Sequence, residues 1–214
     1  MGFIGRTLLA LPALRPVLGY ENSDLVEIIY RKTIAYVPRD EHWPEIQGAQ
    51  AVIDFGGGCG LHYKLARLVE PNIRWAVVET PSMADRASSL ATDRLNFFTD
   101  IESATRWLGS VDLVHSNGAV QYTPDPLGTV AKLCAVNASR MLWRRLFLSD
   151  RPIREMSRSL LAHHGPGFNL SARSVIVSRT SILESDFIRA HTDYDMFKRG
   201  ADWFDFVRSP STDR

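Results

Sequence analysis

The residues best suited to bind a ligand or do chemistry lie in one short stretch, residues 51–63, with the sequence AVIDFGGGCGLHY. Asp54 follows an apolar run, and Gly56, Gly58 and Gly60 come next at alternate positions. Glycines let a backbone approach a ligand closely and adopt positive φ angles. The helical pattern that begins after Gly60 adds free N–H groups and the positive end of a helix dipole. The stretch therefore predicts a strand, a glycine turn and a helix that together hold a nucleotide-like cofactor.

The spacing of the glycines separates two classes of cofactor. A dinucleotide-binding turn has the pattern G-x-G-x-x-G, in which Gly56 and Gly58 fit but Leu61 stands at the third glycine position. The pattern here is D-x-G-x-G-x-G, running from Asp54 to Gly60. This spacing argues against a clamp for the pyrophosphate of a dinucleotide. Asp54 also has a structural alternative, because its carboxylate could order the turn.

Further polar residues stand where other predicted strands end. Glu79 and Asp100 close the second and third predicted strands, and the pair Ser116–Asn117 closes the fourth. Ligands of open parallel sheets bind at the carboxyl ends of the strands, where the strand order reverses. Strand ends also need caps and turn formers, and Asp100 could simply cap the next helix. A glycine turn followed by acids at the next two strand ends is the combination that indicates a ligand site.

Apolar β-like runs alternate with helical patterns from residue 51 onward. After the first run, Leu61, Leu65 and Leu68 repeat at helical spacing, and Pro71 ends that helix. The alternation predicts an α/β fold with a doubly wound, mostly parallel seven-stranded sheet and a C-terminal antiparallel hairpin. The expected strands are residues 51–55, 73–79, 95–100, 111–117 and 140–150, followed by the segments DYDMFKRG and ADWFDFVR of the hairpin.

The segments around this core have less regular patterns. Residues 1–48 predict an N-terminal helical arm and linker, residues 49–208 the main domain, and residues 209–214 a disordered tail. The arm could pack on the domain, on a second subunit or on a membrane surface, and packing is the preferred interpretation. Residues 151–180 interrupt the alternation and predict a long loop or lid that contains the motif HHGPG.

Composition limits the partners and the compartment. Of 214 residues, 45% are hydrophobic and 23% charged, and the net charge of +1 provides no field to recruit nucleic acid. The apolar N-terminal stretch is too short and too interrupted to span a bilayer and lacks a secretory cleavage pattern. Cys59 and Cys134 have no metal-ligand spacing. We therefore expect a cytoplasmic protein with free thiols, no metal, no nucleic-acid partner and no membrane insertion; a homodimer is compatible with the sequence.

Several motifs resemble those of a known superfamily. The D-x-G-x-G-x-G turn after an apolar strand resembles the first motif of the class I, Rossmann-like methyltransferases that use S-adenosylmethionine. VVETP after the second strand and DLVHSNGAVQYTPDP around the fourth are similar to later motifs of that superfamily, in the same order, so the resemblance covers residues 50–150. The DFGGG variant is similar to a family of bacterial methyltransferases without settled substrates, and there the likeness covers most of the chain.

The resemblance implies S-adenosyl-L-methionine as the cofactor and a role for each matching residue. It places the methionine end on the glycine turn and the ribose hydroxyls on Glu79, whose carboxylate would accept two charge-assisted hydrogen bonds. It places Asp100 near the adenine. The implied cofactor-binding residues are Asp54, Gly56, Gly57, Gly58, Gly60, Glu79, Thr80, Asp100, Ile101, Ser116, Asn117 and Gly118.

Methyl transfer is an in-line displacement in which the protein mainly positions the acceptor and excludes water. A base helps when the acceptor is a hydroxyl. His164 of HHGPG is the first candidate, followed by His163, Tyr122 and His115, and the predicted catalytic residues are His164 and Tyr122. The HHGPG loop could instead be a lid with glycine hinges. His62 opens the helix after the glycine turn and could either reach the cofactor or serve packing.

The predicted function is transfer of a methyl group from S-adenosylmethionine to a small-molecule, sugar or lipid-linked acceptor, at oxygen or nitrogen. SNGAVQY lacks the N-P-P-Y or D-P-P-Y sequence expected for methylation of the amino group of a base or of glutamine. Two alternatives stay open. One is an NAD(P)-dependent oxidoreductase, against which Leu61 counts. The other is a non-catalytic cofactor-binding protein on the same fold, because no base stands out.

Overall fold

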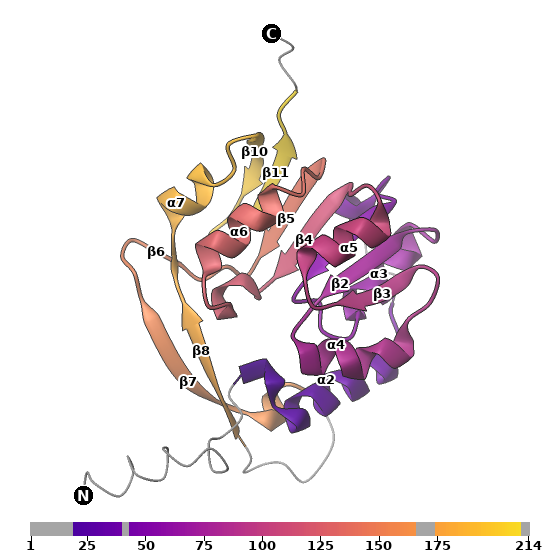
Figure 1. Cartoon of the computed structure of the whole chain (residues 1–214). Coiled ribbons are helices and arrows are strands. Elements are labelled where there is room, and N and C mark those ends of the chain that lie inside the picture. The colour runs from indigo at the N-terminus through magenta and orange to yellow at the C-terminus, as the bar shows by residue number, and fades with distance from the viewer. Residues whose placement is uncertain (1–18, 40–42, 166–173, 211–214) are drawn as a thin grey trace, which may run out of the picture.

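The computed structural model describes residues 19–39, 43–165 and 174–210. A seven-stranded sheet forms its centre, with helices on both faces (Figure 1). The first five strands along the chain run parallel, and the C-terminal hairpin is antiparallel, so the predicted fold class is confirmed. In spatial order the strands are β10 (Tyr194–Arg199), β11 (Phe204–Arg208), β5 (Arg140–Arg144), β4 (Leu113–Asn117), β1 (Ala51–Phe55), β2 (Arg74–Val78) and β3 (Leu95–Phe98).

The order of the strands reverses beside β1. The chain moves outward from β1 to β2 and β3, then crosses back to place β4 on the other side of β1. Ligands of doubly wound sheets bind at such a reversal, outside the carboxyl ends of the strands. The glycine turn after β1 and the Ser116–Asn117 pair at the end of β4 therefore lie at the expected binding edge.

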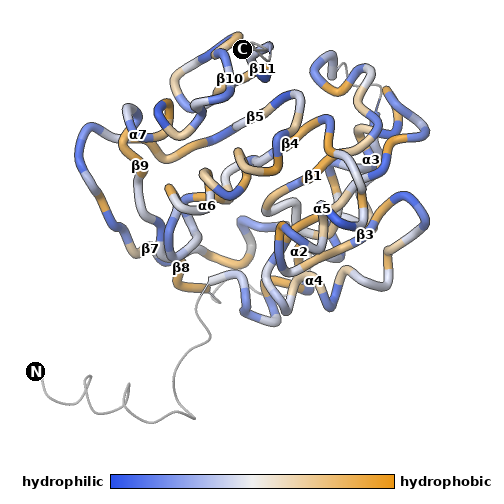
Figure 2. Tube along the Cα trace, turned by 45° about the horizontal axis from the view of Figure 1, so that its top comes forward, coloured by the Kyte–Doolittle hydropathy of each residue, from blue (hydrophilic) through white to orange (hydrophobic). Residues whose placement is uncertain are grey.

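Helices that follow β1, β3 and β4 cover the two faces of the sheet. α3 (Leu61–Val69) contributes Tyr63 and Ala66 to the core on one face, and α5 (Ile101–Leu108) and α6 (Pro126–Cys134) cover the other face. Figure 2 shows hydrophobic residues along β1 and α6. The remaining short elements are α4 (Pro81–Ala87), α7 (Glu184–Arg189), β6 (Leu148–Ser149), β9 (Ile182–Leu183) and the 3-10 helices η3 (Pro44–Ile46), η4 (Ser88–Leu90), η5 (Val120–Tyr122) and η6 (Leu161–His163).

The N-terminal helix packs beside the glycine turn. η2 (Gly19–Glu21) leads into α2 (Ser23–Ala35), and a side chain placed at Gly58 would come within 3.2 Å of Ile29 of α2. An ion pair of 2.8 Å joins Glu27 of α2 to α4. The described part of the expected arm therefore packs on the sheet domain. Residues 1–18 lie outside the described residues, and the division at residue 48 stays a prediction.

Residues 154–160 and 174–180 form two antiparallel strands, so the long loop predicted across residues 151–180 was wrong for these two segments. β7 (Arg154–Leu160) pairs antiparallel with β8 (Ser174–Thr180), and the hairpin runs along one side of the molecule toward α2 (Figure 1). Val175 and Val177 of β8 are buried in a cluster with α2. β7, with the sequence REMSRSL, has no apolar alternation and is largely hydrophilic in Figure 2. Its strand form depends on pairing with β8, which a local pattern does not show.

Two further expectations concern the thiols and the membrane. Cys59 and Cys134 form no disulfide, as expected. Across residues 19–39, 43–165 and 174–210, the helices all fall short of the length and apolarity that crossing a bilayer requires.

A buried histidine makes the stability of the fold depend on pH. The His191 ring stacks on Phe206 with centroids 4.0 Å apart, accepts a hydrogen bond from Trp143 Nε1 at 2.9 Å and contacts the Phe187 carbonyl oxygen at 2.8 Å. Burial lowers the pKa of His191 from 6.5 to about 4. Between these values the unfolded chain binds more protons than the folded chain, so stability is full above pH 6.5 and is lost as pH falls toward 4.

We expect His191 to cost about 2 kcal/mol of stability between about pH 7 and about pH 5. Urea unfolding at the two pH values measures this loss. His191→Gln should be less stable than the wild type at neutral pH, because it loses the stacked ring, but its stability should fall less on acidification. The same acid loss in both proteins would contradict the prediction.

Candidate active site

The turn between β1 and α3 has the backbone form that the glycine spacing predicts. Gly56, Gly58 and Gly60 have φ angles of 73°, 60° and 83°, in the left-handed region that favours glycine. The space is also tight, because a Cβ placed at Gly56 would lie 2.1 Å from Cβ of Ala119. The glycine turn therefore packs directly against the loop that follows β4.

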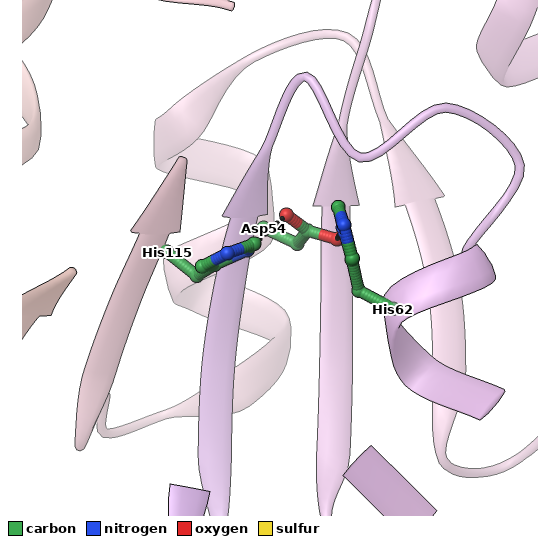
Figure 3. A group of neighbouring side chains, drawn as sticks. All are labelled: Asp54, His62 and His115. Atoms are coloured by element: carbon green, nitrogen blue, oxygen red, sulfur yellow. Dashed lines mark hydrogen bonds and ion pairs between the residues drawn. The ribbon is translucent and has the colours of Figure 1, made fainter. Parts of the chain in front are cut away.

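Asp54 lies fully buried beneath the turn, between two histidines (Figure 3). Its Oδ1 is 2.8 Å from His115 Nδ1, and its Oδ2 contacts His62 Nδ1 at 3.3 Å and Trp75 Nε1 at 3.1 Å. A Cβ at Gly57 would collide with the same carboxylate, 2.3 Å from Oδ2. Burial alone raises the pKa of Asp54, but the facing imidazoles outweigh it and hold that pKa well below its usual range. Asp54 is thus an ionised carboxylate that supports the turn.

The same three side chains raise the question of a metal site. Asp54, His62 and His115 offer ligand atoms within 4.8 Å of one another, and imidazoles with a carboxylate are common metal ligands. The hydrogen bonds favour a different arrangement. Arg145 Nε can only donate, and it lies 2.6 Å from Asn117 Oδ1, so the Asn117 amide turns its NH₂ group toward His62 Nε2 at 3.4 Å.

The tautomer of His62 follows from this assignment. With the Asn117 NH₂ group assigned toward Nε2, the matching tautomer of the neutral ring has its lone pair on Nε2 and its proton on Nδ1, which then donates to Asp54. A protonated Nδ1 has no lone pair to offer a metal ion. The geometry therefore favours a carboxylate that accepts from two imidazoles and the Trp75 indole over three ligands of one ion.

Glu79 lies at the end of β2 beside the glycine turn. Its Oε1 accepts a hydrogen bond from the Gly58 backbone N–H, and its Oε2 accepts one from the Thr80 backbone N–H, both at 2.9 Å. Each carboxylate oxygen keeps a second lone pair for another donor. Burial raises the pKa of Glu79. The contact to ribose hydroxyls stays a prediction, but the side chain is held in place to make it.

Three buried side-chain atoms near these strand ends have no hydrogen-bond partner within the described part of the chain: Thr80 Oγ1, Ser116 Oγ and Gln121 Oε1. Thr80 stands at the N-cap of α4, yet its hydroxyl makes no capping hydrogen bond. An unpaired buried polar group costs about 1–3 kcal/mol, and such groups indicate where water or a ligand completes the structure. A polar nucleoside with an amino-acid tail offers the donors and acceptors that these atoms lack.

Asp100 caps α5, as the structural alternative predicts. Its Oδ1 accepts a hydrogen bond of 2.7 Å from the Ser103 backbone N–H, and that bond lowers the pKa of Asp100. Asp100 and Ile101 also line an open cleft of about 890 Å³ between α5 and α6, which Phe55 and Val78 close at the ends of β1 and β2. Their position near the adenine stays a prediction.

Tyr122, a predicted catalytic residue, pairs with a tyrosine that the sequence did not single out. Its ring lies edge-on to Tyr20 of η2, with centroids 5.3 Å apart. Burial raises the pKa of Tyr20. The neighbouring Tyr122 and Glu79 raise this pKa further, whereas Arg145 lowers it. These influences place Tyr20 near the ends of β2 and β5. No local pattern signals this position, because it depends on where the N-terminal segment packs.

His164, the other predicted catalytic residue, lies between the hairpin and α2. Its Nε2 is 2.8 Å from Ser159 Oγ of β7. Burial lowers the pKa of His164, with smaller contributions from His163 and Lys32. The last two residues of the HHGPG motif lie outside the described residues. The role of His164 as a base therefore stays a prediction.

No protein-family model matches the chain. No curated protein matches it either. Among solved structures, the chain is similar to an O-methyltransferase family protein from Burkholderia thailandensis, with 13% identity, 89% of this chain and 56% of that chain covered, and a TM-score of 0.52. It is similar to the sugar N-methyltransferase KedS8 from Streptoalloteichus sp ATCC 53650, with 14% identity, coverage of 89% and 88%, and a TM-score of 0.51.

A third similar structure is the N-terminal domain of EvdMO1 with SAH bound, at 16% identity, coverage of 90% and 83%, and a TM-score of 0.45. At such low identities the likeness concerns the fold. The two structures with TM-scores of 0.52 and 0.51 are both methyltransferases, so the chain has the Rossmann-like fold of the S-adenosylmethionine-dependent methyltransferases.

Proposed function

We propose that the chain binds S-adenosylmethionine where the strand order reverses between β1 and β4, and that it methylates a small-molecule, sugar or lipid-linked acceptor at oxygen or nitrogen. The observation that carries this proposal is the Glu79 carboxylate, which the Gly58 and Thr80 N–H groups hold at the end of β2. The hydroxyls of Thr80 and Ser116, at the ends of β2 and β4, add to it, because both are buried without a hydrogen-bond partner among the described residues. The bound cofactor would supply an electrophilic methyl group on a sulfonium.

The chain's own residues would bind the cofactor and exclude water. Glu79 accepts hydrogen bonds from a ribose diol, and Ser116 and Gly118 line the β4 side of the site. Asp54 acts from beneath, because its carboxylate is buried and engaged with the histidines. Tyr20 packs edge-on against Tyr122, and Glu79 raises the pKa of Tyr20, so the N-terminal segment borders the proposed site. The fold shared with a sugar N-methyltransferase supports a small polar acceptor.

The proposal also covers the cellular compartment and the family of the protein. Two free thiols support a reducing cytoplasm. The DFGGG turn and the VVETP stretch support membership of the bacterial family that they resemble. A homodimer and the lack of a nucleic-acid partner stay predictions.

Glu79→Gln should weaken binding of S-adenosylmethionine about 10- to 100-fold, because charge-assisted hydrogen bonds contribute about 1.5–3 kcal/mol. Isothermal titration calorimetry of the wild type and the variant measures this. Glu70→Gln is the matched control, since Glu70 follows α3 at the helix end far from the glycine turn. The proposal fails if the folded wild type binds neither S-adenosylmethionine nor S-adenosylhomocysteine. Micromolar binding of NADH instead would favour an oxidoreductase.

A further inference from the structure

A continuous chain of polar contacts runs from the buried His115 of β4 to Arg145, which follows β5. His115 and His62 flank Asp54, His62 Nε2 meets the Asn117 amide, and Asn117 Oδ1 accepts from Arg145. His115 and Asp54 are buried, whereas the His62 side chain keeps 23% of its surface exposed. His62 is therefore the member of the buried trio that a ligand can reach.

The protons in this chain leave His62 ready to accept one more. Its Nδ1–H points to the ionised Asp54 carboxylate, and its Nε2 carries the lone pair. A buried carboxylate behind an imidazole fixes the ring orientation and stabilises the imidazolium that forms on protonation. Burial lowers the pKa of His115, and the neighbouring Asp54 carboxylate opposes that shift.

The lone pair of His62 also lies at the edge of the sheet where a ligand is expected to bind. Nε2 faces Asn117, the last residue of β4, beside the reversal of strand order at which a ligand binds. The hydrogen bond between Nε2 and the Asn117 amide is long, at 3.4 Å, and therefore weak. An acceptor hydroxyl can therefore replace the amide as the donor to Nε2.

We infer that His62 is the general base of this site and that the methyl acceptor is a hydroxyl group. This inference rests on the proposed function. The hydroxyl oxygen forms a bond to the methyl carbon as the carbon–sulfur bond breaks and its electron pair stays on sulfur, and the hydroxyl proton passes to His62 Nε2. Asp54 stabilises the charge that then develops on the ring. An amine with a free lone pair does not need this base in order to attack.

The rival histidine has a different setting. His164 Nε2 is already within hydrogen-bond distance of Ser159 Oγ between the hairpin and α2. Among the histidines of the described ranges, His62 alone combines a carboxylate contact with a partly exposed ring. The sequence-based preference for His164 followed from its loop, and the hydrogen bonds favour His62.

The first test measures the tautomer, without cofactor or acceptor. Long-range ¹H–¹⁵N NMR correlation of the wild type should show the Nδ1–H tautomer for His62, and His62→Asn should remove that signal and so assign it. An Nε2–H tautomer would overturn the inference. Added Zn²⁺ that shifts the His62 and His115 signals together would also overturn it, in favour of a metal site.

The second test separates the base from the binding site. His62→Asn retains an N–H group toward Asp54 and removes the basic nitrogen. It should bind S-adenosylmethionine within about threefold of the wild type, while kcat for phenol or sugar-hydroxyl acceptors, followed as release of S-adenosylhomocysteine, falls about 100-fold or more. His164→Asn is the competing variant and should lose less.

The outcomes distinguish this inference from the proposed function. A folded wild type that does not bind S-adenosylmethionine overturns both. A wild type that binds it but methylates no hydroxyl acceptor, or methylates amines alone, overturns only the hydroxyl assignment and its base. The base is likewise overturned if His62→Asn keeps kcat within about threefold of the wild type, or if the large loss falls on His164→Asn instead.

Discussion

Replacing Asp54 with alanine is expected to lower the free energy of unfolding by about 3–5 kcal/mol. The buried carboxylate is the shared hydrogen-bond acceptor of His62, His115 and Trp75. Its removal leaves three ring N–H groups without that acceptor and opens the space beneath Gly57. Urea unfolding followed by tryptophan fluorescence measures the loss, because Trp75 is itself buried at this position.

Asp112→Ala is the matched control for this loss. Asp112 Oδ2 also accepts more than one hydrogen bond, from the backbone N–H groups of Gln50 and Ala51 at 2.8 and 3.0 Å. These contacts lie nearer the surface, so water can replace the carboxylate, and we expect a loss of about 1 kcal/mol. Equal losses in the two variants would show that burial of Asp54 adds nothing to its contribution.

Gly56→Ala is expected to weaken binding of S-adenosylmethionine about 100-fold and to destabilise the fold by about 2–4 kcal/mol. The backbone at Gly56 has a positive φ of 73°, and the new methyl group would lie 2.1 Å from Cβ of Ala119. Either the glycine turn or the loop after β4 must move, and both border the proposed cofactor site. Calorimetry gives the affinity, and urea unfolding gives the stability.

Gly109→Ala separates backbone strain from the collision. Gly109 has a similar φ of 79°, but a Cβ there would meet no atom within 4 Å. We expect this variant to lose about 1–2 kcal/mol of stability and to keep the wild-type affinity. If both variants lose affinity to the same extent, general destabilisation rather than a local collision weakens binding.

The elements that could be predicted from the sequence have a strong local pattern. The apolar run before Asp54 and the repeat of Leu61, Leu65 and Leu68 identify β1 and α3, because strand and helix periods differ within a few residues. The glycine spacing also predicted the left-handed turn, since each residue's φ depends mainly on its own side chain.

The hairpin β7–β8 shows where this approach fails. The sequence REMSRSL has no apolar face of its own, and it becomes a strand because β8 lies beside it and supplies the buried Val175 and Val177. A strand whose residues are mostly exposed gains little from burial and depends on its partner's backbone hydrogen bonds. Such a partner is invisible to a pattern read along the chain.

The candidate site divides in the same way. By itself the sequence determined the doubly wound α/β fold, the glycine turn and the acids at the strand ends, because hydrophobic period and glycine conformation act over a few residues. It did not determine that Asp54 forms hydrogen bonds with both His62 and His115. Asp54 and His115 lie 61 residues apart, and they meet because β4 pairs with β1 in a register that sets these two residues side by side.

The tertiary structure alone decides such a pairing, since strand order and register result from the packing of the whole sheet. The same holds for Tyr20 of η2, which the packing of the N-terminal segment brings to Tyr122 and the Glu79 side of the site. The chemistry proposed for His62 therefore depends on neighbours that the order of residues in the chain does not reveal.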